Sequence, residues 1–292
     1  MKRNTPLQNE QRFYTEINEF SGKEKMLVYS FIHKNCDVCV HTHDFYEVNI
    51  VVNGRGIHYI GEMEIPVTGG EIFVLPPNVP HGYECHDSLG VEHIIIKTEF
   101  LKKYADVLEG IPGYSAFFEI EPYLRQVNEK KLFLQSESRF LDIVRGQVRI
   151  IREQAYKELY TYQAVIALKL ICDLCIAMSE QCNNTKSEEI KDSDILRVME
   201  FIHMHFSERL SINTLAKIAN MSRPTFHRHF TRTTRMTPVE YITKCRINEA
   251  RKLLEKGDVS RAEIAQLCGF YDTSHMNKYF GQDYTTIKKD CP

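Results

Sequence analysis

The sequence predicts an α+β protein, in which an N-terminal small β-barrel with attached helices precedes an all-α C-terminal domain. Short β-rich segments lie between residues 26 and 100, helical periodicity begins at residue 140, and capped helices follow from residue 194. With 292 residues, of which 43% are hydrophobic and 26% charged, the chain can bury the cores of about two domains. This composition excludes a disordered, collagen-like or coiled-coil protein.

The N-terminal segments are rich in Val, Ile, Phe and Tyr and are separated by turn residues such as Asn53-Gly54 and Gly69-Gly70. We expect strands over residues 26–32, 47–52, 56–60, 72–75 and 92–96. Several short strands at close spacing predict a sandwich or small barrel.

The segment from residue 140 to residue 178 is predicted to form two helices. Phe140, Val144, Val148 and Ile151 recur every three to four positions, and residues 162–178 are apolar on more than one face. Since a barrel of about 110 residues cannot cover so much apolar surface, we expect these helices to form a homodimer interface.

We expect a cytoplasmic protein without a membrane span. The first ten residues contain no apolar signal-peptide core, and the apolar stretch 164–178 is short and interrupted by Lys169 and Asp173. Nine cysteines, an odd number, are typical of reduced thiols in a cytosolic protein.

Charge is distributed unevenly along the chain. Residues 191–292 contain 17 Lys+Arg and 12 Asp+Glu, a net charge of +5, so residues 1–190 carry −7 of the total of −2. Residues 209–239 contain six Lys+Arg and no acidic residue. This asymmetry indicates a polyanionic partner for the C-terminal third.

The polar segment 182–193 is the expected linker between residues 1–181 and residues 194–292. Each helix beyond it has a start signal. Ser193-Asp194, Ser211 and Ser222 are expected caps, Thr237 and Ser260 open capping boxes, and Asp272 or Thr273 caps the last helix.

Two short helices separated by a tight turn occur twice, at residues 212–219 with 223–233 and at 261–267 with 273–280. Each pair fits a helix-turn-helix, whose second helix lies in the DNA major groove. The helix between the pairs is about 28 Å long, close to one DNA turn of about 34 Å. The expected DNA-binding residues are Arg223, Thr225, His227, Arg228, Thr231 and Arg232, followed by Thr273, Ser274, His275, Asn277 and Lys278.

Residues 210–280 resemble the C-terminal domain of the AraC/XylS family of transcription regulators. The resemblance rests on the spacing of residues that include Leu215-Ala216, Pro238, Ile264-Ala265 and Gly269-Phe270. Arg235-Met236 stands where the family usually has a glycine before its Ser/Thr-Pro. The resemblance implies a protein that binds double-stranded promoter DNA.

A second candidate site comprises His41, His43, Glu47 and His81. The first three are odd-numbered and share a face if they lie on one regular strand. Three imidazoles and a carboxylate can hold Zn, Mn, Fe, Ni or Co, or they can line a polar pocket without a metal. The arrangement resembles both cupin motifs, and AraC-type regulators of sugar use commonly carry a cupin-like effector domain at this position.

Together these observations predict a transcription regulator, not an enzyme, that responds to a small-molecule effector such as a sugar or sugar derivative. Two alternatives remain open. A metal-dependent cupin enzyme could use the His41, His43, Glu47 and His81 set, and a metal- or thiol-sensing regulator could use Cys36 and Cys39.

Overall fold

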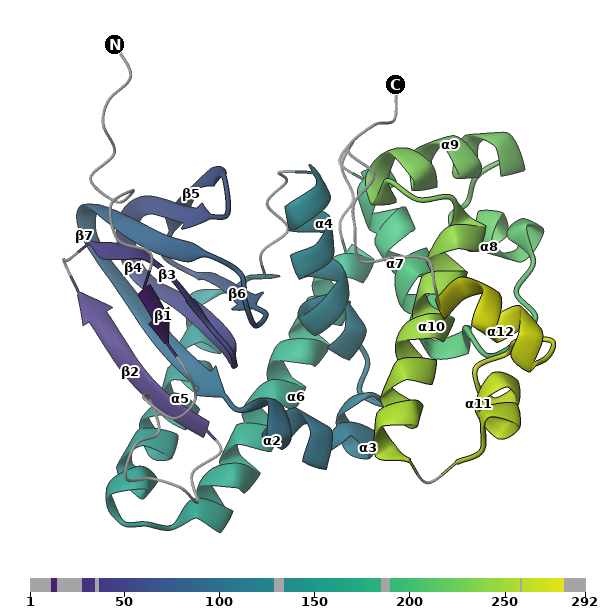
Figure 1. The fold of residues 1–292 in the computed structure, drawn as a ribbon. Helices are drawn as coiled ribbons and strands as arrows, with labels where there is room; N and C mark the ends of the chain where they lie inside the picture. The colour runs from purple at the N-terminus through teal and green to yellow at the C-terminus, as the bar shows by residue number, and fades with distance from the viewer. Residues whose placement is uncertain are drawn as a thin grey trace. The chain divides into compact units, whose positions relative to one another are not determined.

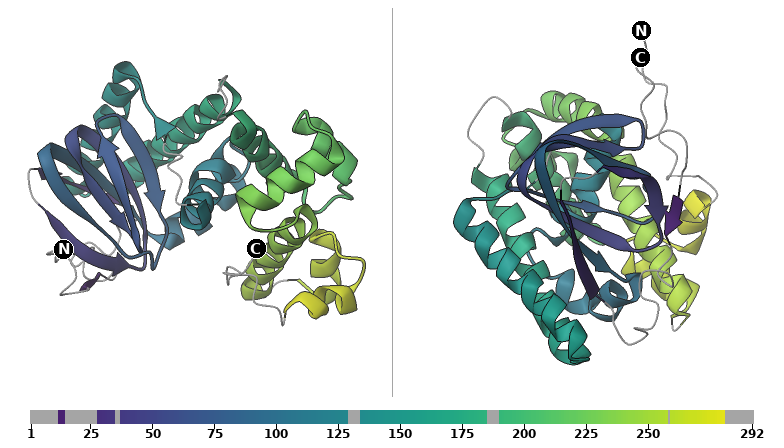
Figure 2. Two further views of the ribbon diagram at one scale, coloured as in Figure 1. Left: turned by 90° about the horizontal axis from the view of Figure 1, so that it is seen from above. Right: turned by 90° about the vertical axis from the view of Figure 1, so that its left-hand side faces the viewer.

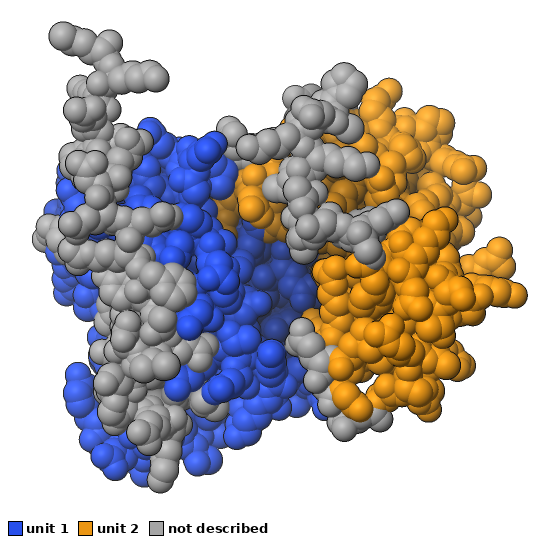
Figure 3. Space-filling model, viewed as in Figure 1, with its two compact units in different colours: residues 1–122, 131–181 blue, residues 123–130, 182–292 orange. Residues whose placement is uncertain are grey.

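A computed structural model describes residues 12–14, 28–34, 37–128, 134–184, 190–257 and 259–280. The chain forms two compact units, shown in different colours in Figure 3. Unit 1 comprises residues 1–122 and 131–181, and unit 2 comprises residues 123–130 and 182–292. The main division therefore follows residue 181, but residues 123–130 belong with the C-terminal unit, which the sequence did not predict.

Unit 1 is built on an eight-stranded, mostly antiparallel sheet whose strands curve around a shared interior (Figures 1 and 2). The central strand β7 (His81–Ile96) pairs with β2 (Val28–Lys34), β3 (Val38–His43) and β4 (Tyr46–Ile60). The remaining strands are β1 (Arg12–Tyr14), β5 (Met63–Thr68), β6 (Glu71–Leu75) and β8 (Leu134–Gln135). An apolar cluster that includes Val51, Phe73 and Tyr83 fills part of the interior.

Strand β4 corrects the predicted strand boundaries. It runs unbroken through residues 46–60, although Asn53-Gly54 was expected to be a turn. The pairing of β4 with β7 shifts between Val51 and Asn53 and again between Asn53 and Arg55, and Gly54 has φ +77°. A glycine with positive φ in a strand is typical of a β-bulge, so this dipeptide bends the strand without ending it.

The helices of unit 1 follow the sheet. They are α2 (Thr98–Lys103), α3 (Ala105–Leu108), the π-helical turn η2 (Ala116–Ile120), the first residues of α4 (Glu121–Asn128), α5 (Ser138–Tyr156) and α6 (Tyr160–Asn184). Helix α5 packs on β2: Arg152 donates a 2.9 Å hydrogen bond to Ser30 Oγ and forms an ion pair with the buried Glu92 of β7. Helices α5 and α6 lie side by side (Figure 2).

Helix α6 is longer than the apolar stretch expected from the sequence. Its residues 160–181 are long and apolar enough to cross a membrane by length and composition alone, and its buried residues include Leu170, Ile171 and Leu174. Two polar contacts join it to α5: Gln163 Nε2 donates to Ile151 O at 3.0 Å, and Gln147 Nε2 donates to Asp173 Oδ2 at 2.6 Å. These contacts and the buried apolar residues pack one side of α6 against the rest of unit 1.

The helices of unit 2 agree closely with the predicted ones (Figure 1). They are α7 (Ile190–His205), α8 (Ile212–Ile218), α9 (Arg223–Thr234), α10 (Pro238–Lys256), α11 (Arg261–Leu267) and α12 (Thr273–Phe280). Both predicted capping boxes are present, at Thr237 and Ser260, and Asp272 accepts the backbone N–H of His275 at the start of α12. Together with an all-α unit 2, the sheet of unit 1 confirms the predicted α+β class.

The expected linker is partly helical. Helix α6 extends to Asn184 and α7 begins at Ile190, so of residues 182–193 only 185–189 lie outside the described residues. Ser193 and Asp194 lie inside α7 and do not cap it, which corrects the prediction. Polar composition did not distinguish a linker from helix ends, because solvent-exposed helical turns have the same composition.

Two turns in unit 2 depend on left-handed backbone conformations. Gly269 has φ +75°, and a Cβ there would lie 2.3 Å from the backbone oxygen of Ser207, so only glycine fits the turn between α11 and α12. Arg235, after α9, has φ +57° and occupies the left-handed position that glycine usually takes.

Replacing Arg152 should destabilise unit 1, because Glu92 would lose its closest cation while it stays buried. We expect Arg152→Leu to lower the free energy of unfolding by about 3 kcal/mol in urea titrations of the full chain. The exposed pair of Arg149 with Glu153 provides the control: Arg149→Leu should change stability by less than about 0.5 kcal/mol. Equal losses for the two variants would contradict this assignment.

Replacing Arg235 with glycine should stabilise unit 2. Glycine adopts positive φ without the steric penalty of a side chain, so Arg235→Gly should raise the free energy of unfolding by about 1 kcal/mol. Arg232→Gly, three residues earlier within α9, should lower it by about 1 kcal/mol, because there glycine costs helix propensity. A loss of stability in Arg235→Gly would show that the arginine side chain, not its backbone, matters at this turn.

Candidate functional site

The interior of the sheet in unit 1 contains a buried carboxylate surrounded by imidazoles. Glu47, on β4, is 3% exposed. Its Oε2 lies 3.0 Å from His43 Nε2 and 3.0 Å from His81 Nε2, and its Oε1 contacts His93 Nδ1. His93 Nε2 in turn lies 3.1 Å from Nδ1 of His33 on β2.

The ionisation of Glu47 follows from these contacts. Burial alone would raise its pKa, but the charge of His93 and hydrogen bonds from His43, His81 and His93 hold the pKa of Glu47 well below its ordinary value. Glu47 is therefore a carboxylate within the sheet.

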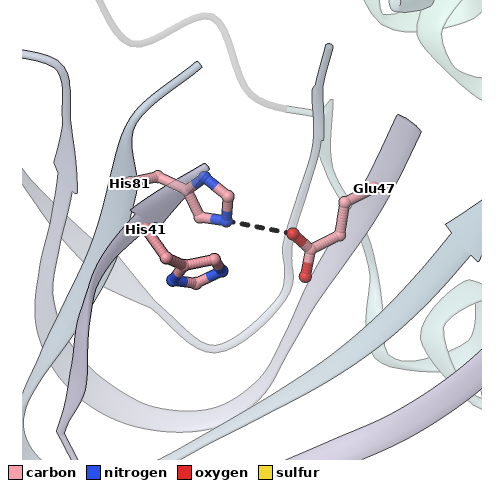
Figure 4. Close-up of side chains that lie close together, drawn as sticks. All are labelled: His41, Glu47 and His81. Atoms are coloured by element: carbon pink, nitrogen blue, oxygen red, sulfur yellow. Dashed lines mark hydrogen bonds and ion pairs between the residues drawn. The ribbon is translucent and has the colours of Figure 1, made fainter. Parts of the chain in front are cut away.

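His41 lies at the edge of the same cluster. Its ring centroid is 4.3 Å from that of His81, and the nearest donor atoms of His41, Glu47 and His81 all lie within 4.8 Å of one another (Figure 4). Burial, with a further contribution from His81, lowers the pKa of His41 to about 4. His41 is therefore a neutral imidazole at neutral pH, the form in which histidine binds metal ions.

Backbone carbonyls orient three of the imidazoles in the same way. The Nδ1 atoms of His41, His43 and His81 lie 2.9 Å from Cys39 O, 2.8 Å from Phe45 O and 2.9 Å from Val79 O. Because a carbonyl oxygen only accepts, each Nδ1 must carry the proton to make this bond. The Nε2 atoms of His43 and His81 face the Glu47 carboxylate, and each can donate a hydrogen bond to it only while the ring carries a second proton.

The four predicted site residues come together, but not along one strand. His41 and His43 lie on β3 and Glu47 on β4, with residues 44 and 45 between the strands. His81 begins β7, and the pairing of β3 with β7 places it opposite His41.

Sequence reasoning missed His93 and His33. His93 lies next to Glu92 in the otherwise apolar segment 91–96, and ionisable residues in a buried strand are a signal for a site. Cys36 of the predicted thiol pair lies outside the described residues, whereas Cys39 is a free, exposed thiol.

In unit 2, the two helix-turn-helix pairs are α8 with α9 and α11 with α12. Phe226 and Phe230 of α9 are fully buried, as is Leu215 of α8, and they hold the first pair together. The opposite face of α9 is solvent-exposed at Arg223, His227, Arg228 and Arg232. The exposed residues of α12 include Ser274, Asn277 and Lys278.

Four other predicted DNA-binding residues are less exposed than expected. Thr225 is half-buried, and its hydroxyl bonds the cap residue Ser222 at 2.8 Å. The Thr231 hydroxyl oxygen is buried, and Thr273 is half-buried. His275 packs its ring against Phe270 and Tyr279, because its position on α12 faces the unit's core.

Comparison with known proteins agrees with this architecture. Residues 33–155 match the model of the AraC-like ligand binding domain, and residues 215–286 match a helix-turn-helix domain. The chain is 26% identical over 248 residues to the HTH-type transcriptional activator RhaS of Enterobacter sp. (strain 638), covering 84% of both chains.

Two solved structures are similar at lower identity. ToxT from Vibrio cholerae O395 is 12% identical, with a TM-score of 0.33, over 90% of this chain and 95% of that one. An RmlC-like cupin from Shewanella frigidimarina is 24% identical, with a TM-score of 0.22, over 25% of this chain and 68% of that one.

The two family matches fall on separate parts of the chain. The ligand-binding match covers most of the sheet and helix α5, and the helix-turn-helix match covers α9 to α12 and most of α8. The order of the two parts is the one that the sequence predicts. The chain belongs to the AraC family of transcription regulators, with an N-terminal ligand-binding domain and a C-terminal DNA-binding domain.

Proposed function

We propose that this regulator is a cytoplasmic homodimer that binds a sugar or sugar derivative inside the sheet of unit 1 and a specific promoter sequence through unit 2. The observation that carries the proposal is the buried cluster of Glu47 with His43, His81 and His93. Burying so many polar groups costs stability, and a fold with no ligand to bind would lose little by replacing them with apolar residues. Hydroxyl-rich molecules fit such an interior because each hydroxyl both donates and accepts.

His41, Glu47 and His81, whose nearest ligand atoms lie within 4.8 Å of one another, fit a divalent transition metal such as Zn, Mn, Fe or Ni. His41 and His81 would bind it through Nε2, with Glu47 as the oxygen ligand, and His43, whose Nε2 lies 3.0 Å from Glu47 Oε2, would be the fourth ligand. The backbone bonds at Nδ1 are those that commonly orient metal-binding histidines. Such a metal would act as a Lewis acid for an oxygen atom of the effector.

The His81→Ala variant tests the effector site. It should lose at least about 90% of the stabilisation that wild-type protein gains from its best ligand, because a ligand stabilises only the state that binds it. Thermal-shift measurements with free pentoses, hexoses and 6-deoxyhexoses, alone and with divalent metals, provide the readout. His86→Ala is the control, because His86 lies on the same strand but is 47% exposed and outside the cluster.

Elemental analysis distinguishes a metal-binding effector site from a metal-free one. Near-stoichiometric metal in purified wild-type protein that is lost in His81→Ala supports coordination. Metal-free wild-type protein that still binds an aldose makes the histidines hydrogen-bond partners. A His43→Ala/His81→Ala variant that folds and still responds fully to the aldose would place the effector site elsewhere.

For DNA binding, we propose that Arg228 contacts base edges from the exposed face of α9 and that Lys278 of α12 contacts phosphate. Arg228→Ala should weaken binding to the cognate promoter by roughly 1 to 3 kcal/mol, and Lys278→Ala by less. Fluorescence anisotropy with cognate and random duplexes at several salt concentrations measures both. If Arg228→Ala weakens binding to both duplexes equally, Arg228 is a backbone contact.

The homodimer is proposed to form through the exposed side of α5 and α6. Large apolar residues there are between 43% and 83% exposed: Ile143, Tyr156, Leu159, Tyr162, Val165 and Ile176. Exposed large apolar residues of this kind are typical of a protein interface, and a second copy presents the same residues.

Val165→Asp should convert the dimer to a monomer, because an unpaired charge would be buried at the interface. Sedimentation velocity at micromolar concentration measures the change. Val107→Asp is a matched control, since Val107 on α3 is 58% exposed and Val165 is 55% exposed. A wild-type protein that is monomeric with and without effector would refute the dimer.

Membership of the AraC family makes the chain a DNA-binding regulator and not the cupin enzyme that the sequence left open. The other alternative is a metal- or thiol-sensing regulator that uses Cys36 and Cys39. In that case metal alone, without an aldose, would change the affinity of the full chain for promoter DNA.

A further inference from the structure

We propose that Asn49 binds a hydroxyl group of the effector and so determines which ligands the interior of unit 1 accepts. This inference rests on the proposed function, since it assigns a contact within the same effector site.

The position of Asn49 places its side chain in the interior of the sheet. It is 0% exposed and stands on β4 between Glu47 and Val51, two residues from each. Alternate residues of a strand share a face, and Val51 belongs to the apolar cluster of the interior. The register agrees, because the residues opposite Asn49 are Phe73 on β6 and His93 on β7, which also lie inside.

The carboxamide of Asn49 has no hydrogen-bond partner among the residues that the structure describes. Neither Oδ1 nor Nδ2 is bonded, although both atoms are fully buried. Most buried polar side chains are paired, as Gln163 is with Ile151 O. An unpaired buried amide costs free energy in the ligand-free protein, and that cost is recovered if a bound molecule supplies the missing donor and acceptor.

The chemistry of this amide indicates the ligand class. Oδ1 accepts up to two hydrogen bonds and Nδ2 donates two, so the group matches a hydroxyl, or two neighbouring hydroxyls, of an uncharged polyol. Glu47 lies two residues away on the same face, about 7 Å along the strand, a separation that one sugar ring can bridge. The pair therefore favours a neutral sugar over a fatty acid or an aromatic effector.

Asn49→Leu provides the sharpest test, because leucine has nearly the same shape and no polar atoms. In the full chain without ligand it should raise the melting temperature by about 2 °C or more, since the unpaired amide is removed. For the free aldose that stabilises wild-type protein most, it should weaken binding at least about tenfold by isothermal titration calorimetry.

The deoxy analogues of that aldose locate the contact. One of them should bind wild-type protein and Asn49→Leu equally, because the hydroxyl that Asn49 contacts is then missing. Val51→Thr, two residues along the same face, controls for a general disturbance of the interior and should keep the preference for the parent aldose.

Three results would overturn the proposal. Equal affinity of Asn49→Leu and wild type for the aldose would remove Asn49 from the site while leaving the sugar function intact. A lower melting temperature for ligand-free Asn49→Leu would show that the amide is already satisfied inside the protein, for example by water. If no aldose stabilises wild-type protein, the sugar function itself fails, and the role of Asn49 fails with it.

Discussion

The N-terminal unit depends on how one buried charge is compensated. Glu47 is almost inaccessible to water, and a carboxylate in that position is tolerated only with partners that carry protons or positive charge. Its partners come from β3 and β7, and His33 extends the set to β2. Four strands are therefore constrained by a single side chain on β4, and their register cannot slip without leaving a buried ion unpaired.

The backbone contacts of His41, His43 and His81 add a second constraint. A neutral imidazole that donates its Nδ1 proton to a carbonyl has only a lone pair at Nε2. In His43 and His81 that lone pair faces carboxylate oxygen at 3.0 Å, an arrangement that is stable only if a cation, either a proton or a metal ion, lies between the two atoms. The folded chain thus requires a positive charge between Glu47 and these imidazoles, and the metal content of the purified protein shows whether a metal ion supplies it.

Helices α8 to α12 of unit 2 were predictable from the sequence almost residue by residue, because their start and stop signals are local. Thr237 with Glu240 and Ser260 with Glu263 mark helix starts through contacts three residues apart. The strands of unit 1 were less predictable. Strand β5 contains Pro66, and the ends of β4 and β7 depend on pairing across the sheet. In the same way, His41, His43, Glu47 and His81 were recognisable as a motif, but His93 joins them only through the register of β7 with β4, which no local pattern encodes.

Two neighbouring residues of strand β7 make contacts on opposite faces of the sheet. His93 points into the sheet toward Glu47, and Glu92, the residue before it, points out toward Arg152 of α5. Because one peptide bond joins them, a rotation of the strand that relaxes the inner contact must strain the outer one. The contact of His93 with Glu47 inside the sheet and the contact of Glu92 with Arg152 of α5 are therefore coupled through a single peptide bond of β7.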